Sequence, residues 1–423
     1  MKAFKNVNLV TCDEAFHIYL EGLLVLEDDC ILYCGTFDQS WLEQCQEVID
    51  YSGAWIMPGL VNCHTHSAMT TLRGIRDDSN LHEWLEDYIW PAESEFTSEI
   101  TTKATQLALI EMLQSGTTTF NDMYNPVGVE ISHIYSVVQA SKMRAYFSPT
   151  LFSSPLETDE ETIQRTRKII EEILSYQNDR FKVMVAPHSP YTCSRELLKQ
   201  SYDLATELDL MIHIHVAETE EETNIILERY GKRPLEFLKE LGYLDRSAIF
   251  AHGVELTKDE ILELGQSNVA IAHNPISNLK LASGIAPIIE LKKAGVVVGL
   301  ATDSVASNNN LDMFEEARTA ALLQKMRAKD ATQFTIEQTL KSLTIEGAKA
   351  LGLADKIGSL EVGKQADFLV IQPEKKVHLY PTENMLSHLV YAVKGSDVQD
   401  VYIAGEQVVK NGQVLTVEVP DMS

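Results

Sequence analysis

Apolar and polar residues follow two different patterns along this chain, and the first pattern covers residues 1–56. There, short runs rich in strand-forming residues are separated by polar turns, with one short helical piece near 41–46. The expected strands are Val7–Val10, Ile18–Leu26, Ile31–Gly35 and Glu47–Asp50. The pattern predicts a strand-rich segment without a long helix.

From Ile56 onward, apolar strand runs alternate with amphipathic helices. The expected strands are Ile56–His64, Thr117–Asp122, Arg144–Thr150, Lys182–His188, Met211–Ala217, Ala248–His252, Val269–His273 and Val296–Asp303. The clearest helices are Ser98–Ser115, Glu160–Leu174, Ser194–Leu208 and Leu311–Ala328. Eight strand–helix repeats over about 290 residues match an α/β fold of the (β/α)₈ TIM-barrel type. A doubly wound open sheet is the alternative, but the G-x-G-x-x-G turn expected of it is absent from the sequence.

After a helix around Thr344–Leu353, the sequence pattern again predicts strands near the end of the chain. The expected strands there are Phe368–Gln372, Val398–Ile403 and Glu406–Lys410. We therefore predict a barrel over residues 57–355. Residues 1–56 and 356–423 are predicted to pair as the two parts of one small β-sandwich.

The chain of 423 residues has a net charge of −27, from 35 basic and 62 acidic residues. This balance argues against nucleic acids and anionic membranes as partners, but it allows a small nucleoside or base as a substrate. The six cysteines form no C-x-x-C pair, and we expect neither a signal peptide nor a membrane span. A small-molecule substrate and a reducing cytoplasm are the expectations, and the sequence leaves open whether the chain forms a homo-oligomer.

Residues that can bind a metal recur where the apolar runs of the expected barrel strands end. His64 and His66 end the first run, and their i, i+2 spacing places both side chains on one face of a strand. The carboxyl ends of barrel strands meet at one mouth, where catalytic groups gather. The other residues at these ends are His188, His215, His252, His273 and Asp303, with Glu218 three residues beyond His215.

The expected metal ligands are His64, His66, His215 and Asp303. Three imidazole nitrogens and one carboxylate suit zinc and similar ions, and they leave a position for water. His213 shares a strand face with His215 and is the competing ligand, but Glu218 follows His215 closely enough to reach a substrate on the metal. We therefore expect a packed or supporting role for His213. Helix capping is the alternative for Asp303, although a carboxylate after an apolar run is better satisfied by a metal or its bound water.

These motifs resemble the amidohydrolase superfamily, in its deaminase and chlorohydrolase branch, over nearly the whole chain. The matching segments are 58–66 (PGLVNCHTH), 213–219 (HIHVAET), 273–278 (HNPISN), 301–304 (ATDS) and 358–367 (GSLEVGKQAD). Within the branch, the chain is most similar to the group of 5′-methylthioadenosine and S-adenosylhomocysteine deaminases.

The resemblance implies a (β/α)₈ barrel flanked by a two-part β-sandwich, with one divalent metal ion on the four ligands named above. Binuclear members of the superfamily use a carboxylated lysine on strand 4. Lys182 opens that strand here, far from the mouth, so a single metal ion is expected. Zinc is the default, and iron and manganese are the alternatives.

The resemblance also implies a hydrolase that releases ammonia from an aminated purine nucleoside, such as 5′-methylthioadenosine, S-adenosylhomocysteine or adenosine. In this scheme the metal activates water and Asp303 accepts its proton. Glu218 protonates the ring nitrogen, and His252 orients the hydroxide and stabilises the tetrahedral intermediate. The two carboxylates thus have opposite acid–base roles.

Three further residues are expected to bind the substrate. Glu93 matches a glutamate that binds the ribose hydroxyls in adenosine-type members, although a solvated loop acid is the alternative. His188 matches a substrate-contacting position. Arg144 is the arginine nearest to those that hold the amino-acid carboxylate of S-adenosylhomocysteine after strand 3. It opens that strand, however, and residues 147–152 contain no arginine, so a carboxylated tail is expected to be poorly held.

Two rival interpretations remain from the sequence. The same scaffold could deaminate guanine, cytosine or a pterin, or remove chlorine from a triazine. A non-catalytic barrel is the other rival, and the presence of the complete set of ligands and acid–base residues argues against it.

Overall fold

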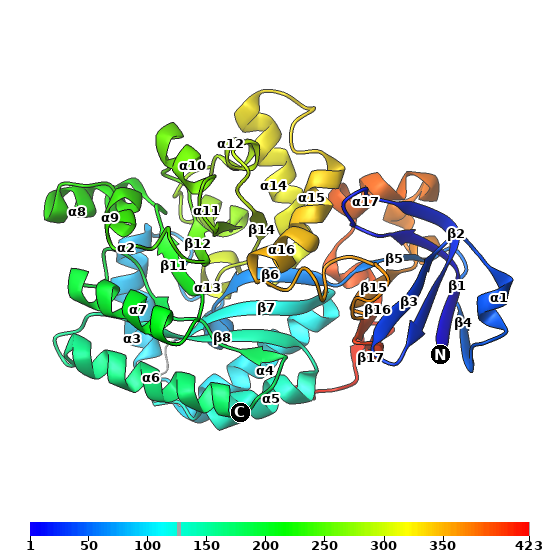
Figure 1. Ribbon diagram of the computed structural model, residues 1–423, viewed down its shortest axis with the longest axis horizontal. Coiled ribbons are helices and arrows are strands. Elements are labelled where there is room, and N and C mark those ends of the chain that lie inside the picture. Colours follow the sequence, from blue (N-terminus) through cyan, green and yellow to red (C-terminus); the bar gives the residue numbers. More distant parts are fainter. Residues whose placement is uncertain (125–127, 423) are drawn as a thin grey trace.

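Strands from both ends of the chain pair in one nine-stranded mixed sheet, which lies beside an α/β part in the computed structural model (Figure 1). The structure describes residues 1–124 and 128–422. The strands of this terminal sheet are β1 (Lys2–Val10), β2 (Ile18–Glu27), β3 (Cys30–Gly35), β4 (Glu47–Asp50), β5 (Trp55–Pro58), β15 (Phe368–Ile371), β16 (Val398–Ile403), β17 (Glu406–Lys410) and β18 (Gln413–Val414). The expected association of the two chain ends is therefore present, as one hydrogen-bonded sheet.

The seam between the two chain ends is the antiparallel pair β5–β15. Three aromatic rings pack behind it, with ring centroids 5.2 Å apart for Phe4 and Phe368 and 4.6 Å apart for Phe368 and Tyr402. All three residues are fully buried, so they form a core that neither end of the chain could complete alone.

The α/β part contains two parallel sheets. The first comprises β6 (Leu60–Thr65), β7 (Thr117–Tyr124), β8 (Arg144–Leu151), β9 (Phe181–Lys182) and β10 (Ala186–Pro187), and the second comprises β11 (Ile212–Val216), β12 (Ala248–His252), β13 (Val269–His273) and β14 (Val298–Leu300). Single parallel bridges, Thr65 to Asp303 and Val185 to Ile212, connect the edges of the two sheets. Nearly all residues of these strands are buried, as is typical of parallel strands covered on both faces.

The expected strand Ile56–His64 is divided between the two parts of the molecule. Pro58 has no N–H to donate, and the N–H of Gly59 donates to the carbonyl of Asp367 beside the terminal sheet. The N–H of Leu60 donates instead to Gly116, which precedes β7. A Cβ atom at Gly59 would lie 2.3 Å from Oγ1 of Thr118, so glycine permits the close approach at the crossing.

Helices follow most strands of the α/β part and cover its outside (Figure 1). The longer ones are α4 (Ser98–Gln114), α5 (Ile131–Ser141), α6 (Asp159–Ser175), α7 (Arg195–Glu207), α8 (Glu220–Tyr230), α14 (Met313–Ala328) and α15 (Ile336–Leu343). The shorter ones are α1 (Gln39–Leu42), α2 (Leu81–Trp84), α3 (Trp90–Glu93), α9 (Pro234–Glu240), α10 (Lys258–Leu264), α11 (Pro275–Lys280), α12 (Ile288–Lys293), α13 (Val305–Asn308), α16 (Ile345–Ala350) and α17 (Met385–Tyr391), with a π-helical turn, η2 (Leu85–Ile89), between α2 and α3. Side chains cap several of them, as Thr158 and Glu161 do in a capping box on α6.

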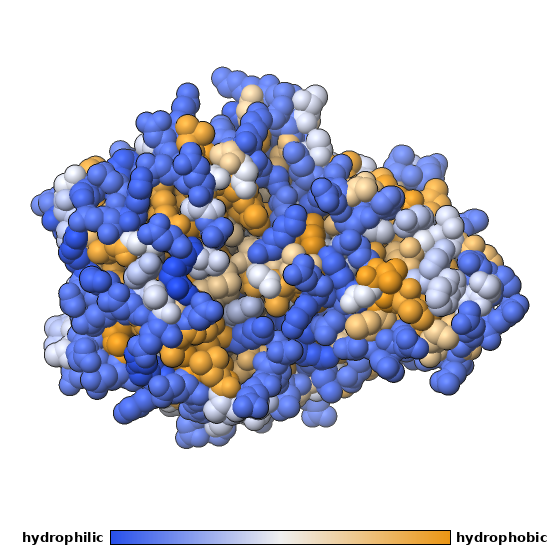
Figure 2. Space-filling view, viewed as in Figure 1, coloured by the Kyte–Doolittle hydropathy of each residue, from blue (hydrophilic) through white to orange (hydrophobic). Residues whose placement is uncertain are grey.

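Hydrophilic residues cover most of the face in Figure 2, in keeping with the acidic charge excess. Hydrophobic residues gather at the end formed by β1–β3 and near the middle of the α/β part. Among residues 1–124 and 128–422, no helix has both the length and the hydropathy needed to cross a membrane.

Candidate active site

Residues at the carboxyl ends of four parallel strands converge in one buried cluster. His64 lies in β6, His215 in β11 and His252 at the end of β12, while Asp303 follows β14. Each offers one ligand atom, and these four atoms lie within 4.8 Å of one another. The strand-end pattern thus brought together three histidines and one aspartate, the donor set of a candidate metal site.

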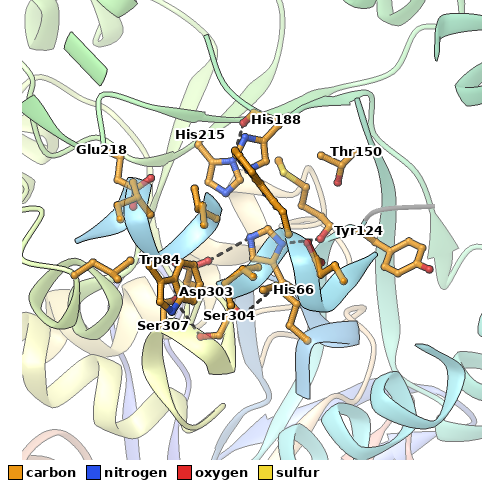
Figure 3. A pocket seen from close by; sticks show the side chains of 18 of the residues that line it. His66, Trp84, Tyr124, Thr150, His188, His215, Glu218, Asp303, Ser304 and Ser307 are labelled. Carbon is orange, nitrogen blue, oxygen red and sulfur yellow. Dashed lines mark hydrogen bonds and ion pairs between the residues drawn. The ribbon is translucent and has the colours of Figure 1, made fainter. Parts of the chain in front are cut away.

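His66 lies directly beside this cluster. Its ring is parallel to that of His215 at a centroid distance of 5.5 Å, and its Nε2 is 3.3 Å from Oδ1 of Asp303. Figure 3 shows His66, His215 and Asp303 pointing toward one another. The structure therefore adds His252 to the expected set and leaves His66 within reach of the same carboxylate.

The hydrogen bonds of two rings decide which nitrogen faces the cluster. Nδ1 of His66 donates to the carbonyl of Met123 at 2.8 Å, and Nδ1 of His215 donates to the carbonyl of His188 at 2.7 Å. A carbonyl oxygen can only accept, so in each neutral ring the proton lies on Nδ1 and the lone pair lies on Nε2. Metal-binding histidines are oriented by contacts of this kind.

This arrangement fits a bound cation. The buried Nε2 of His64 lies 3.1 Å from Oδ1 of Asp303 and makes no hydrogen bond. Burial lowers the pKa of His64 to about 4 and that of His215 well below its usual range, so both rings are neutral near pH 7. In its neutral form His66 directs the Nε2 lone pair at Oδ1 of Asp303, 3.3 Å away, and a divalent metal ion between the two atoms would remove their repulsion.

The carboxylate of Asp303 is fixed on its other side by two hydroxyls. Ser277 donates to Oδ2 at 2.6 Å and Ser307 donates to the same oxygen at 3.2 Å. The backbone of Asp303 has a φ of 62°, and that of His252 has a φ of 76°. Such left-handed conformations cost non-glycine residues about 1–2 kcal/mol each. They are typical of sites where the direction of a side chain matters.

Glu218 follows β11 and faces the same space, at the edge of the group in Figure 3. Its Oε2 lies 3.6 Å from Nε2 of His252, whose Nδ1 contacts Oδ1 of Asn278 at 2.8 Å. Burial raises the pKa of Glu218 to about 8. The loop itself is held by Glu222, which accepts the backbone N–H groups of Ala217 and Glu218 at 3.0 and 2.7 Å.

Two of the three expected substrate residues line the pocket above this cluster. Glu93 comes from α3, and burial raises its pKa to about 7. The ring of His188 lies 4.6 Å from that of His215 and is stacked on Phe152 at 4.5 Å. The other aromatic residues of the pocket wall are Trp84, Trp90, Tyr124 and Tyr191.

Arg144 does not lie in this pocket. It is the first residue of β8, at the amino end of the strand, whereas the pocket lies at the carboxyl ends. Its guanidinium makes two hydrogen bonds to the carboxylate of Asp367, at 2.9 and 3.1 Å, and both side chains are buried. The structure therefore gives Arg144 a contact between the α/β part and the terminal sheet in place of the expected substrate contact.

Sequence reasoning missed the residues that support the site. They are Asn121, Asp122, Glu222, Ser277, Asn278 and Ser307, and all are buried polar residues. His213 had been expected to play such a part, and its Nε2 does lie 2.9 Å from Nδ1 of His64. The sequence feature that could have identified these supporting residues is the number of polar residues in segments that are otherwise apolar, such as 273–278.

Comparison with known proteins is consistent with this site. 5-Methylthioadenosine/S-adenosylhomocysteine deaminases from Bacillus cytotoxicus and Bacillus cereus are each 47% identical to this chain, over 98% of it and 95% of the relative. An adenosine deaminase structure from Xanthomonas campestris with bound zinc is 33% identical, with a TM-score of 0.92 over 98% of this chain and 94% of its own. A zinc-containing atrazine chlorohydrolase from Arthrobacter aurescens TC1 shares the fold, with a TM-score of 0.89 at 22% identity, over 99% of this chain and 97% of its own.

A family model, that of the amidohydrolase family, matches residues 55–408. This span includes the candidate metal cluster, Glu218 and the aromatic residues of the pocket wall. The chain therefore belongs to the amidohydrolase family.

Proposed function

We propose that this protein is a metal-dependent aminohydrolase that removes the amino group of a purine nucleoside carrying a 5′-thioether, as in 5′-methylthioadenosine or S-adenosylhomocysteine. The observation that carries the proposal is the joint position of Glu218, His252 and Asp303 at one pocket, in a chain 47% identical to deaminases of that name. The reaction replaces the ring C–N bond to the amine by a C–O bond from water and releases ammonia.

The proposed ligands of the metal are His64, His66, His215 and Asp303, with His252 as the alternative to His66 on geometry alone. His66 is preferred because its Nδ1 donates to the carbonyl of Met123, so that its Nε2 faces Asp303. His252 also contacts Glu218, and it is therefore better placed to act on the reacting water. When bound, a divalent ion such as zinc would lower the pKa of water from about 15.7 to about 7.

The residues around that position then divide the proton transfers between them. Asp303 accepts the proton of the attacking water, since Ser277 and Ser307 already orient its carboxylate. Glu218 is the acid, because burial favours its protonated form, and it donates that proton to the ring nitrogen next to the attacked carbon. The proton taken up by Asp303 then moves to the leaving amine, which departs as ammonia. His252, held by Asn278, orients the water and stabilises the developing negative charge.

Glu93 and His188 are the proposed substrate contacts. A carboxylate suits a vicinal diol because it can accept two hydrogen bonds, and Glu93 is placed on the pocket wall to meet the ribose. His188 stacks on Phe152 and lies beside His215, where it can contact the base or sugar.

We also infer the architecture that holds this site. The two parallel sheets and their two connecting bridges are consistent with a closed (β/α)₈ barrel over about residues 57–355, with residues 1–56 and 356–423 as the second domain. All six cysteines are free, which is compatible with a reducing cytoplasm.

Ammonia release from a panel of substrates tests the proposed function. The panel contains 5′-methylthioadenosine, S-adenosylhomocysteine, adenosine, guanine, cytosine and a pterin. Chloride release is followed for a chlorotriazine, and bound metal is measured on the same preparation. We expect the highest kcat/KM with a 5′-thioether nucleoside. Turnover of a free base or of the triazine in preference to every nucleoside would contradict the proposal.

A further inference from the structure

Glu316 is a fully buried acidic residue that the proposed chemistry does not use. It lies in the first turn of α14 and has no exposed surface. Among residues 1–124 and 128–422, no basic side chain forms an ion pair with it. Burial raises the pKa of Glu316 well above its ordinary value, and a carboxyl group without a cation is costly to bury. Its two oxygens therefore need hydrogen-bond donors, and these donors come from two different loops of the site.

The first donor is the backbone N–H of Ile276, at the start of α11. It lies 3.2 Å from Oε2 of Glu316. The side chain of Asn274, the residue before the helix, accepts none of the N–H groups of α11, so Glu316 supplies an acceptor that the helix itself lacks. The next residue, Ser277, donates to Oδ2 of Asp303 at 2.6 Å.

The second donor is Nδ2 of Asn308, the last residue of α13. It donates to Oε1 of Glu316 and also to the carbonyl of Thr302, at 2.7 Å from the latter. Both hydrogens of this amide are therefore used. The preceding residue, Ser307, is the other hydroxyl that donates to Oδ2 of Asp303, and the two side chains lie together in Figure 3.

The two contacts of Glu316 thus join the supports of the two serines. The Oγ atoms of Ser277 and Ser307 lie 3.0 Å apart, and both face the same oxygen of Asp303. The helices that carry them, α11 and α13, have only six and four residues. Helices of that length are not stable by their own hydrogen bonds, so an external link is needed to fix the positions of both hydroxyls.

We propose that Glu316 is a positioning residue for the proton transfer from water, because it holds Ser277 and Ser307 where their hydroxyls orient the carboxylate of Asp303. This inference rests on the proposed function, in which Asp303 accepts that proton. Glu316 itself does not line the pocket, so its effect falls on the chemical step and not on substrate binding. A displacement of about 1 Å at a reacting group can lower a rate about 100-fold.

Glu316→Gln tests the proposal at nearly constant side-chain volume. An amide has one acceptor oxygen, so one of the two donors loses its partner whichever protonation state the carboxyl group had. In protein shown by elemental analysis to be metal-loaded, we expect kcat for 5′-methylthioadenosine to fall about 10- to 100-fold, with KM within about twofold of the wild type. Hydrogen exchange measured by mass spectrometry should become faster in α11 and α13 and stay unchanged in the terminal sheet.

A second background separates positioning from a general loss of stability. In protein that already carries Ser277→Ala and Ser307→Ala, the further change Glu316→Gln should lower kcat by no more than about threefold, because the hydroxyls through which it acts are gone. Asn308→Ala, which removes one end of the link, should lower kcat in the same direction as Glu316→Gln. It takes the place of that variant if Glu316→Gln does not fold.

Asp400→Asn is the matched control. Asp400 is a buried carboxylate of the terminal sheet that accepts the N–H of Asn411 at 2.8 Å and the hydroxyl of Tyr51 at 2.6 Å. Its replacement should leave kcat and the exchange of α11 and α13 unchanged.

Three results would overturn the positioning role of Glu316. They are an unchanged kcat in folded, metal-loaded Glu316→Gln, an equal loss of kcat in the wild-type and double-serine backgrounds, and unchanged hydrogen exchange in α11 and α13. The exchange measurement needs no turnover, so it tests the link independently of the reaction. The proposed function fails instead if the wild-type protein releases ammonia from no nucleoside.

Discussion

The Nε2 atom of His64 lies 3.1 Å from Oδ1 of Asp303, and the backbone N–H of Asp303 donates to the carbonyl of His64 at 3.0 Å. The strands that carry these residues are the first and the last of the α/β part in chain order, and the bridge between Thr65 and Asp303 holds them together. The carboxylate of Asp303, the proposed catalytic base, is thus positioned by the contact that joins the two parallel sheets.

Asp303→Asn should lower kcat by about 10²–10⁴-fold, because an amide cannot accept the proton of the attacking water. Asparagine tolerates the left-handed backbone at this position, and Ser277 and Ser307 can still donate to its oxygen, so the fold should persist. Ammonia release and circular dichroism measure the two effects. Turnover near the wild-type rate in metal-loaded protein would remove Asp303 from its proposed role.

Glu218→Gln should lower kcat by about 10²–10⁴-fold with little change in KM, since glutamine keeps the shape and polarity of the side chain but cannot transfer a proton. Glu221→Gln is a suitable control because Glu221 is exposed three residues further along the chain. The two variants are compared by steady-state kinetics. An equal effect of both substitutions would argue against an acid role for Glu218.

His66→Ala should reduce bound zinc per chain and lower the melting temperature of the protein. The loss follows because Nε2 of His66 faces Asp303 and would be a missing ligand, and a bound metal stabilises by about 4 kcal/mol at a thousandfold excess over its Kd. Elemental analysis and thermal unfolding with and without a chelator provide the measurements. His133→Ala, at an exposed histidine of α5, is the control. Full zinc content in His66→Ala would favour His252 as the ligand.

Glu222→Gln should flatten part of the pH dependence of stability between about pH 4.5 and 7. Burial raises the pKa of Glu222 to about 7, from 4.5 in an exposed chain, so the folded protein retains a proton that the unfolded chain releases in this range. That difference stabilises the fold fully below pH 4.5 and is lost as the pH rises through 7. It amounts to about 3 kcal/mol at most, at about 1.4 kcal/mol per pKa unit.

The check on this prediction is urea unfolding of both proteins at several pH values. The free energy of unfolding of the wild type should fall relative to that of Glu222→Gln as the pH rises. A constant difference across the range would show that Glu222 does not change its protonation state there.

Arg144→Ala should destabilise the protein by about 3–5 kcal/mol and leave KM for every substrate unchanged. The substitution leaves the buried carboxylate of Asp367 without its cation, although the N–H of Ala404 still donates to it at 2.7 Å. Arg167→Ala, which breaks an exposed pair, should cost less than about 1 kcal/mol. Chemical denaturation and kinetics separate the two effects, and a raised KM in Arg144→Ala would restore the substrate role expected from the sequence.

The sequence by itself determined the placement of the chemistry along the chain. A histidine or acidic residue after an apolar run indicates a strand end, and the carboxyl ends of parallel strands meet at one edge. That rule brought His64, His215, His252 and Asp303 together without any knowledge of their distances, and it located Glu218 beside them.

Only the tertiary structure decided which side chains meet away from the strand ends. By its position in the chain, Arg144 is the arginine nearest to the expected tail site. It lies at the amino end of β8, however, opposite the pocket, and it is buried against Asp367. Arg229 of α8 is distant in sequence from Tyr191, yet its Nη1 donates to the carbonyl of Tyr191 beside the pocket. The local periodicity of the sequence determines which residues share one face of a helix or strand and which residues lie at its end. Contacts between loops and helices depend instead on packing across the whole molecule, which the pattern of residues along the chain does not record.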